Sequence, residues 1–520
     1  KTPSHDVYGN GDQAVVPEYL DSNHLIPSDD VDWVDEILRA AVVQSYNLSF
    51  TKADKKSNQL FSLGYYDQQG LVKFSDFKRV SGRFNSEYKL FDDHLRIGEN
   101  ISLSHSWGTS VSNNAALGGT LYEAYKFQSI TPVKNLEDEY AGNVFSDIPN
   151  PMGKLYRNKD NQDKKSRLVG NLYAELHLFD GLMFKTSFGV DYNNLYRRSF
   201  SPKYDELNAS EKLSSLSNRN AWNFNWVFTN TLTYNKTFGD HTINALLGME
   251  SLRNRYEYFT ASRDGFPSDD PNFRFLDAGD VGTQKNSGAA TEYSMVSYFG
   301  KLDYNYHDRY LVAFTLRRDG SSRLGNNKWG NFWAIGTAWR ITNEPFIKGV
   351  AFLDDMKIKL SWGKNGNQGL TQYSTLSQVA TGHSGGIYYP FGNSGKPSYG
   401  INQSTIGNSD LGWETTEAWN MGFESTWLNS RLFVDVDVYF SKTYDQIFSR
   451  SIPVMTGFAS MYSSMGEVKN RGVEATVRTV NIQNKEFNWT TGLTFWLNRN
   501  KLVHLYGEDL DGDGKEDDDI

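Results

Sequence analysis

The sequence predicts an all-β protein whose strands form a transmembrane antiparallel β-barrel. Three observations support this prediction: segments in which apolar and polar residues alternate, segment lengths that suit a bilayer, and connections that alternate between short and long. The segment 431–448 shows the alternation most clearly, because successive side chains of a strand point to opposite faces. One face of this segment carries Leu432, Val434, Val436, Val438 and Phe440. The other face carries Asp435, Asp437, Tyr439 and Ser441.

Composition agrees with a β-rich membrane protein. Aromatic residues make up 14% of the 520 residues, a bias typical of strands. The net charge of -9 argues against a nucleic-acid partner, because phosphate neutralisation needs clustered Lys and Arg. The chain has no cysteine, which excludes disulfides and thiolate metal sites. No window approaches the ~18 consecutive apolar residues of a transmembrane helix.

Sixteen alternating segments are predicted along the chain, most of them roughly the 9–11 residues that cross a bilayer when tilted. They begin near residues 46, 57, 77, 95, 168, 182, 222, 241, 294, 310, 331, 356, 415, 431, 466 and 487. Asp180 and Gly181 provide the turn signal of a hairpin between the segments near 168 and 182.

The connections between these segments alternate in length. The mostly short ones lie at about 51–56, 88–94, 179–181, 235–240, 307–309, 341–355, 428–430 and 481–486. The mostly long ones lie at about 67–76, 107–166, 194–221, 252–293, 318–330, 363–414 and 443–465. Short turns on one side and long loops on the other are the layout of an outer-membrane barrel, whereas a soluble β-protein has no reason to sort its loops. We therefore expect lipid against the apolar face and water against the polar face.

Several stretches resemble the barrel of SusC/RagA-type TonB-dependent outer-membrane transporters, in the order found in that family. They are DWVDEILRAAVVQSYNLSF (32–50), SNQLFSLGYYDQQGLVKFSDFKRVSGRFN (57–85), RRDGSSRLG (317–325), WAIGTAWRITNEPFI (333–347), KIKLSWGKNGNQGL (357–370), LGWETTEAWNMGFE (411–424) and MGEVKNRGVEATV (465–477). The resemblance runs from about residue 31 to the end of the chain.

The resemblance implies a barrel of about 22 strands with a plugged lumen in the bacterial outer membrane. It also implies an N-terminal plug domain, a segment that contacts the TonB complex, and a SusD-like surface lipoprotein that covers the barrel. The implied function is uptake of oligosaccharides, or of oligopeptides as the alternative, without enzymatic activity. A passive porin or structural barrel is the alternative from another class.

The sequence departs from the family in two ways, because no plug precedes residue 31 and the chain stops at Ile520 inside an expected loop. We therefore expect a partial barrel over 31–497, with one family strand missing before it and about five after it. An extracellular-side segment, 1–30, would precede this partial barrel. An acidic extracellular loop, 498–520, would follow it.

The acidic loop carries a candidate calcium site. Asp509, Asp511 and Asp513 stand at positions 1, 3 and 5 of an EF-hand-type loop, where alternating carboxylates wrap a hard cation. The carbonyl of Lys515 and the carboxylate of Asp517 would complete the set, although position 12 lacks the usual Glu. A solvated acidic loop is the alternative.

The long loop 363–412 carries candidate substrate contacts, because aromatic faces suit sugar rings and peptides. These residues are Tyr388, Tyr389, Phe391 and Tyr399. Aromatic packing within the loop is the alternative. No catalytic residue is predicted: Asp435 and Asp437 are interpreted as solvated wall residues, the histidines lack zinc spacing, and the glycines near 363–369 lack phosphate-loop spacing.

Overall fold

The computed structural model describes residues 4–5, 9–11, 15–111, 118–347, 349–381, 387–389 and 398–505. Its main feature is one antiparallel sheet of 16 strands whose order in the sheet follows the order in the chain. These strands are β3 (Val43–Ala53), β4 (Ser57–Gln69), β5 (Asp76–Leu90), β6 (Leu95–Gly108), β7 (Gln162–Phe179), β8 (Leu182–Ser201), β11 (Ser215–Phe238), β12 (His241–Asp264), β13 (Lys285–Tyr306), β14 (Tyr310–Ser321), β15 (Trp329–Arg340), β16 (Leu353–Asn367), β21 (Glu414–Trp427), β22 (Leu432–Tyr444), β25 (Glu467–Gln483) and β26 (Asn488–His504).

Smaller elements lie in the connections between these strands or before β3. The short strands are β1 (Ser4–His5), β2 (Gly9–Asn10), β9 (Tyr204–Glu206), β10 (Ala209–Glu211), β17 (Gln378–Thr381), β18 (Tyr388–Tyr389), β19 (Ser398–Tyr399), β20 (Ile401–Thr405), β23 (Ile447–Ser451) and β24 (Ser460–Ser464). The helices are α1 (Trp33–Ile37), α2 (Thr120–Lys126) and α3 (Pro151–Asn158), with 3-10 turns η1 (Pro271–Phe273), η2 (Leu276–Ala278), η3 (Val281–Thr283), η4 (Ile341–Asn343) and η5 (Val454–Thr456).

The predicted all-β class and the sixteen predicted segments are confirmed, because each segment corresponds to a strand of the large sheet. The predicted lengths are wrong for most strands: β11 and β12 have 24 residues each and β13 has 22. These strands continue past the alternating apolar segment with polar residues on both faces. Backbone pairing holds the extension, since β11 pairs with β12 from Ser215 opposite Asp264 to Phe238 opposite His241.

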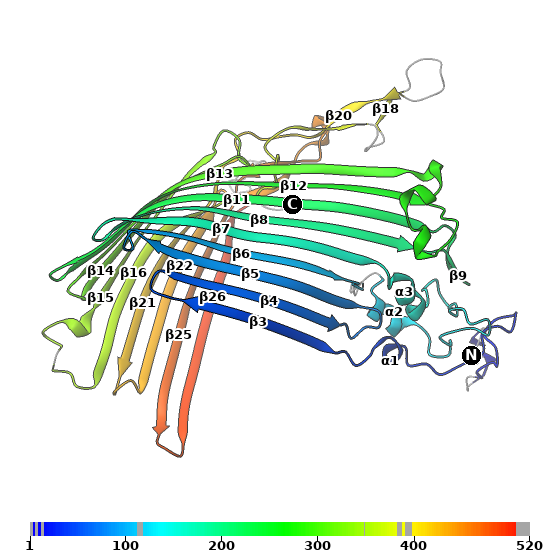
Figure 1. The fold of residues 1–520 in the computed structure, drawn as a ribbon, viewed down its shortest axis with the longest axis horizontal. Helices are drawn as coiled ribbons and strands as arrows, with labels where there is room; N and C mark the ends of the chain where they lie inside the picture. Colours follow the sequence, from blue (N-terminus) through cyan, green and yellow to red (C-terminus); the bar gives the residue numbers. More distant parts are fainter. Residues whose placement is uncertain are drawn as a thin grey trace, which may run out of the picture.

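The sheet curls strongly. In Figure 1, β3 and β26 overlap in the view although they lie at the two ends of the strand order. Among the described residues each of these strands pairs on one side only, β3 with β4 and β26 with β25. β3 is exposed along its whole length and β26 is exposed up to residue 502. The large sheet is therefore an open, curved wall.

Exposed apolar side chains gather on one face of this wall, which we call the apolar face. The strand register aligns them in rows, and one row runs through Leu302, Phe314, Ile335, Trp362, Trp419 and Phe440. Phe440 is 47% exposed and Leu302 is 45% exposed, although both are large and apolar. The opposite face, with Asp435 and Asp437, we call the polar face. Among the described residues, no helix is both long and apolar enough to cross a membrane.

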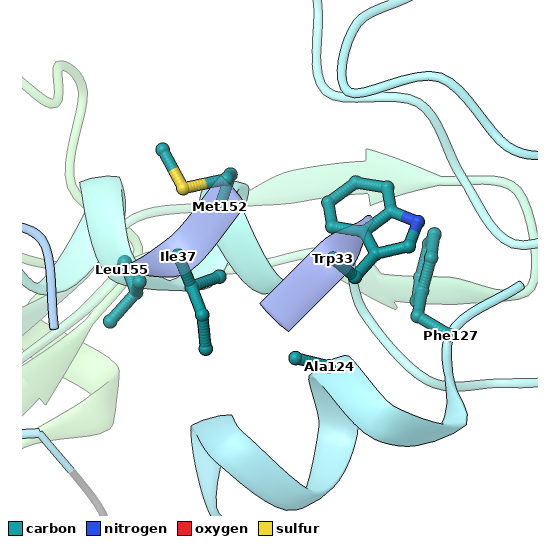
Figure 2. Packing of buried hydrophobic residues seen from close by; sticks show 6 residues of the cluster. All are labelled: Trp33, Ile37, Ala124, Phe127, Met152 and Leu155. Carbon is teal, nitrogen blue, oxygen red and sulfur yellow. The ribbon is translucent and has the colours of Figure 1, made fainter. Parts of the chain in front are cut away.

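The buried hydrophobic clusters lie among the long loops and the adjoining ends of wall strands. In the largest cluster, α1, α2 and α3 pack together through Trp33, Ile37, Ala124, Phe127, Met152 and Leu155 (Figure 2). The rings of Trp33 and Phe127 meet edge to face with centroids 4.6 Å apart. Asp32 and Asn150 cap the N-termini of α1 and α3 by accepting backbone N–H bonds. Helices α2 and α3 lie within the connection 107–166, for which the sequence analysis predicted only a long loop.

The two ends of the wall differ as predicted. At the end that we call the short-turn end, Gly181 has φ +88°, a left-handed conformation that favours glycine, and it follows the predicted Asp180 in the turn between β7 and β8. A Cβ on Gly181 would lie 2.4 Å from the carbonyl oxygen of Asn235. Figure 1 shows the helices α1, α2 and α3 and the strand β9 together at the other end, the long-loop end.

Candidate functional site

The polar face of β16, β21 and β22 carries a network of ion pairs centred on Lys359. Its Nζ lies 3.4 Å from Asp435 Oδ1, 3.8 Å from Asp437 Oδ2 and 3.6 Å from Glu424 Oε2. Lys357 Nζ lies 2.9 Å from the same Glu424 oxygen. Asp435 and Asp437 thus stand where the alternation predicted, on the polar wall, and Lys359 compensates their charges.

A hollow of about 540 Å³ opens beside this network. Small side chains on three neighbouring strands make room for it, and these are Ala313, Gly336, Ala338 and Ser361. Amides and charged groups border it: Asn244, Asp303, Asn305, Lys359, Asn420 and Asp437. The Oδ1 atom of Asn305 is buried and has no hydrogen-bond partner in the described part of the chain. The hollow therefore offers a polar solute both hydrogen-bond donors and acceptors.

Charges of both signs are interspersed elsewhere on the polar face. Arg317 Nε lies 2.7 Å from Asp319 Oδ1, and Lys185 Nζ lies 2.8 Å from Glu175 Oε1. The hydroxyl of Tyr173 donates to Glu87 Oε2 at 2.9 Å. Because neighbouring charges compensate each other, this wall suits polar solutes without strong net charge.

A second cleft, of about 530 Å³, lies among the loops at the long-loop end. Tyr140, Tyr156 and Tyr204 line it together with Arg157 and Lys159. The Arg157 guanidinium carbon and the Lys159 ammonium nitrogen each lie 3.9 Å from a ring centroid, over Tyr204 and Tyr156 respectively. Burial raises the pKa of Tyr140 and of Tyr204, so both phenols keep their proton and stay able to donate a hydrogen bond.

Glu206 fixes one wall of this tyrosine cleft. Its side chain is buried and lies 2.5 Å from Arg157 Nη1, and the backbone N–H of Asn150 donates to it at 2.7 Å. Burial raises the pKa of the Glu206 carboxyl above its ordinary value of 4.5, against the opposing effect of Arg157. The contacts join strand β9 to the N-terminus of α3.

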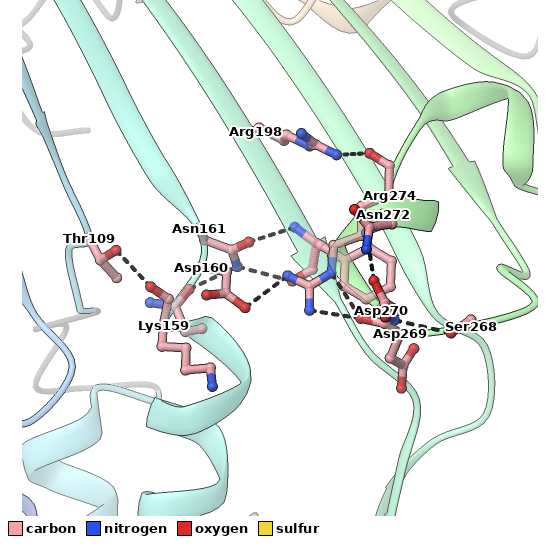
Figure 3. A network of polar contacts seen from close by, with 12 residues as sticks. Thr109, Lys159, Asp160, Asn161, Arg198, Ser268, Asp269, Asp270, Asn272 and Arg274 are labelled. Carbon is pink, nitrogen blue, oxygen red and sulfur yellow. Dashed lines mark hydrogen bonds and ion pairs between the residues drawn. The ribbon is translucent and has the colours of Figure 1, made fainter.

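A polar network holds the other wall (Figure 3). Arg274 Nη1 lies 3.1 Å from Asp160 Oδ2, and Arg274 also donates twice to the Asp269 carbonyl, at 3.0 and 2.8 Å. Asn161 exchanges two hydrogen bonds with the backbone of Phe200. Loop 265–284 is thereby tied to the start of β7 and the end of β8, and the cleft is held in shape without a ligand.

The structure places the predicted aromatic contacts in a separate hairpin. Tyr388 pairs with Tyr399 across β18 and β19, and Tyr389 pairs with Ser398. Tyr399 is 61% exposed and Tyr389 is 40% exposed. Phe391 lies outside the described residues. The assignment of these residues to substrate contact stays a prediction.

Sequence reasoning missed the three tyrosines of the cleft. Tyr140 and Tyr156 come from the connection between β6 and β7, whereas Tyr204 comes from the connection between β8 and β11. No spacing in the sequence joins them, because the fold brings separate loops together. An abundance of tyrosine in loops was the available signal.

The predicted calcium ligands Asp509, Asp511, Asp513, Lys515 and Asp517 lie outside the described residues. Among the residues that the structure does describe, no three His, Asp or Glu side chains are grouped to hold a metal ion. The calcium site therefore also stays a prediction.

The model of the family "TonB dependent receptor-like, beta-barrel" matches residues 106–519. TonB-dependent receptor P3 of Formosa agariphila is 30% identical over 497 residues, which are 94% of this chain and 48% of that protein. TonB-dependent receptor SusC of Bacteroides thetaiotaomicron is 29% identical over 92% of this chain and 49% of its own length. The RagAB peptide importer in the 'closed-closed' state superposes with TM-score 0.80 at 26% identity, over 93% of this chain and 53% of that chain.

Proposed function

Because the chain belongs to the TonB-dependent receptor-like β-barrel family and is SusC/RagA-like, we propose that it forms the wall of an energised importer in the bacterial outer membrane. The chain spans about half the length of the relatives that it matches. The observation that carries the proposal is the division of the wall into an exposed apolar face and an ion-paired polar face. Lipid would cover the first face, and solute would pass along the second.

Oligosaccharides are the proposed substrate class. The tyrosine cleft offers three rings with adjacent hydrogen-bond donors, a combination that suits the apolar faces and hydroxyl groups of sugars. The mixed charges of the polar face also favour a solute without net charge. Oligopeptides are the second candidate, favoured by the similarity to the RagAB peptide importer.

Two partners complete the proposal. A SusD-like surface lipoprotein would sit on the long-loop end and cover the ligand beneath it. The TonB complex would supply energy through a plug, as expected for the TonB-dependent receptor-like family to which the chain belongs. The family and the relatives are transporters and receptors by name, so we assign the wall no enzymatic step.

Uptake of labelled oligosaccharides by cells tests the proposal. Tyr140→Ala combined with Tyr204→Ala should lower uptake by about 30-fold, since stacking contacts of this kind contribute on the order of 1 kcal/mol each. Tyr125→Ala, on an exposed side chain of α2 that does not line the cleft, is the matched aromatic control. Uptake that persists in cells without TonB would instead indicate a passive porin. Uptake of labelled peptides but not of sugars would move the assignment to the second candidate.

We also propose that the acidic segment 509–517 binds calcium at the outer surface. Carboxylates crowded at alternate positions repel one another without a cation, and extracellular sites bind calcium with dissociation constants on the order of 10⁻⁴–10⁻³ M. Asp511→Ala together with Asp513→Ala should abolish binding measured by calorimetry on the purified protein. Unchanged calcium uptake by that variant would leave the segment as a solvated loop.

A further inference from the structure

The apolar face ends in a basic surface at the long-loop ends of β25 and β26. Along β26, the apolar residues Leu493, Phe495 and Leu497 give way at the next alternate positions to Arg499 and Lys501. Along β25, Val473 gives way in the same direction to Arg471 and Lys469. We call Arg471, Arg499, Lys469 and Lys501 the cationic patch. All four side chains are exposed.

The strand register sets like charges against each other in this patch. Arg471 lies opposite Arg499, and Lys469 lies opposite Lys501. Side chains at such positions stand about 5 Å apart at Cβ, and like charges directly opposite each other destabilise a sheet. Two successive pairs of this kind therefore call for a bound anion.

The protein compensates only part of this charge. Glu467 lies 3.0 Å from Lys469 and 2.7 Å from Lys442 of the neighbouring β22. Within the part of the chain that the structure describes, Arg471, Arg499 and Lys501 form no ion pair. By contrast, two arginines of the apolar face on β12 are both paired, Arg253 with Glu292 at 2.6 Å and Arg255 with Glu257 at 2.9 Å.

A groove of about 860 Å³ runs between these cations. Trp419, Phe440 and Lys442 line it as well, and so does the carboxylate of Glu417, which lies 3.5 Å from Lys364. Phe440 stands in the same cross-strand row as Arg471 and Arg499. The next row toward the short-turn end holds Val438, Val473 and Leu497. A molecule in this groove meets cations at one end and continuous apolar surface at the other.

We propose that the groove binds the phosphate groups of a membrane lipid, whose acyl chains extend along the apolar face toward the short-turn end. Arginine matches phosphate oxygens with two parallel hydrogen bonds, which explains unpaired guanidinium groups at this level of the wall. The inference rests on the proposed outer-membrane location and identifies a lipid contact, separate from the solute path on the polar face.

A second candidate occupant of the groove belongs to the same chain. The acidic segment 508–519 follows β26 after a few residues and lies outside the described residues. Its carboxylates match the cations in charge. A phosphorylated lipid satisfies both halves of the groove, and we therefore assign the groove to lipid.

Lipid titration of the full-length protein in detergent, followed by native mass spectrometry, tests the inference. The probes are diphosphoryl lipid A and phosphatidylcholine. Arg471→Gln with Arg499→Gln should weaken lipid A binding on the order of 30-fold, since each cation near a lipid surface contributes about 1 kcal/mol, and should leave phosphatidylcholine binding unchanged. Arg253→Gln with Arg255→Gln is the control on the same face and should bind lipid A normally. Unheated electrophoresis verifies that each variant is folded.

Three results would overturn the inference. The first is undiminished lipid A binding by the folded Arg471→Gln, Arg499→Gln variant. The second is displacement of lipid A by inorganic phosphate alone, which would assign the site to a free anion. The third is lipid A binding that appears only after Asp509, Asp511 and Asp513 are changed to Asn, which would make the acidic segment the occupant. Failed oligosaccharide uptake with intact lipid binding would refute the proposed substrate alone, whereas failed membrane insertion would refute both proposals.

Discussion

A single buried group, Glu206, makes the stability of the long-loop end depend on pH. Its pKa is raised from 4.5 by burial, so folding favours the protonated form. A raised pKa contributes stability that is complete below the unfolded value and is lost as the pH rises through the folded value. The region around α3 should therefore be more stable in mildly acidic solution than at neutral pH, because burying the charged carboxylate costs more than its contacts with Arg157 and Asn150 recover.

We expect Glu206→Ala to destabilise the α3 region by about 3–5 kcal/mol, because it leaves Arg157 buried without its partner. Glu206→Gln should keep one hydrogen bond and abolish the pH dependence. The measurement is the rate of limited proteolysis between β6 and β7 as a function of pH. Asp205→Ala is the control, since the Asp205–Lys212 pair is exposed and contributes below about 1 kcal/mol. Equal cleavage of Glu206→Ala and wild type would contradict the role of Glu206.

Lys359 lies within 4 Å of three carboxylates of the polar face, those of Glu424, Asp435 and Asp437. Lys359→Met should destabilise the wall by about 1 kcal/mol, because Asp435 and Asp437 lose their cation while remaining partly exposed to solvent. The same substitution in an Asp435→Asn, Asp437→Asn background should cost less, because only Glu424 still pairs with Lys359 there and Lys357 also compensates Glu424. Unfolding in lipid measures both values. An equal cost in the two backgrounds would show that the effect comes from packing of the lysine stem.

Strand β22 illustrates what the sequence could predict at the level of an element. Its strict alternation predicted both faces and the strand position within about a residue, since predicted start 431 compares with Leu432. The sequence analysis missed the parts of β7, β11 and β13 nearest the long-loop end. In these parts neither face alternates between apolar and polar residues, so only backbone pairing defines the strand. The short helices α2 and α3 were missed as well, since their stability comes from packing against α1.

The same strand gives a direct test of the apolar face. Val436→Arg should destabilise insertion by roughly 2–4 kcal/mol if the residue lies near the middle of the membrane. Phe423 and Ala475 flank Val436 in its cross-strand row, so neither directly opposite side chain can pair with the new charge. Tyr439→Arg, on the polar face of the same strand, is the matched control and should be tolerated. Unchanged folding of Val436→Arg in lipid would place this face away from hydrocarbon.

The whole molecule reverses the usual position of apolar residues. The wall turns its large apolar side chains outward, whereas the buried clusters hold the loops together at one end. This arrangement gives the long-loop end a preformed surface on which a partner can sit. We expect mild detergent extraction of the full-length protein to yield a surface lipoprotein at equal stoichiometry, detected by mass spectrometry. Repeated isolation without any lipoprotein would count against the proposed partner.

The unequal strand lengths have a mechanical consequence. β11 and β12 have 24 residues each, whereas β14 and β15 have 12 each, a difference of about 40 Å measured along a strand. At the long-loop end, β11 and β12 form a continuous hydrogen-bonded sheet, and this part of the wall is therefore stiff. Beyond β16, the connections at the long-loop end carry separate two-stranded hairpins, β17 with β20 and β23 with β24, which can bend independently. A partner protein seated on the long-loop end would rest on stiff sheet at β11 and β12 and on bendable hairpins beyond β16. It would therefore move by tilting about the β11–β12 side.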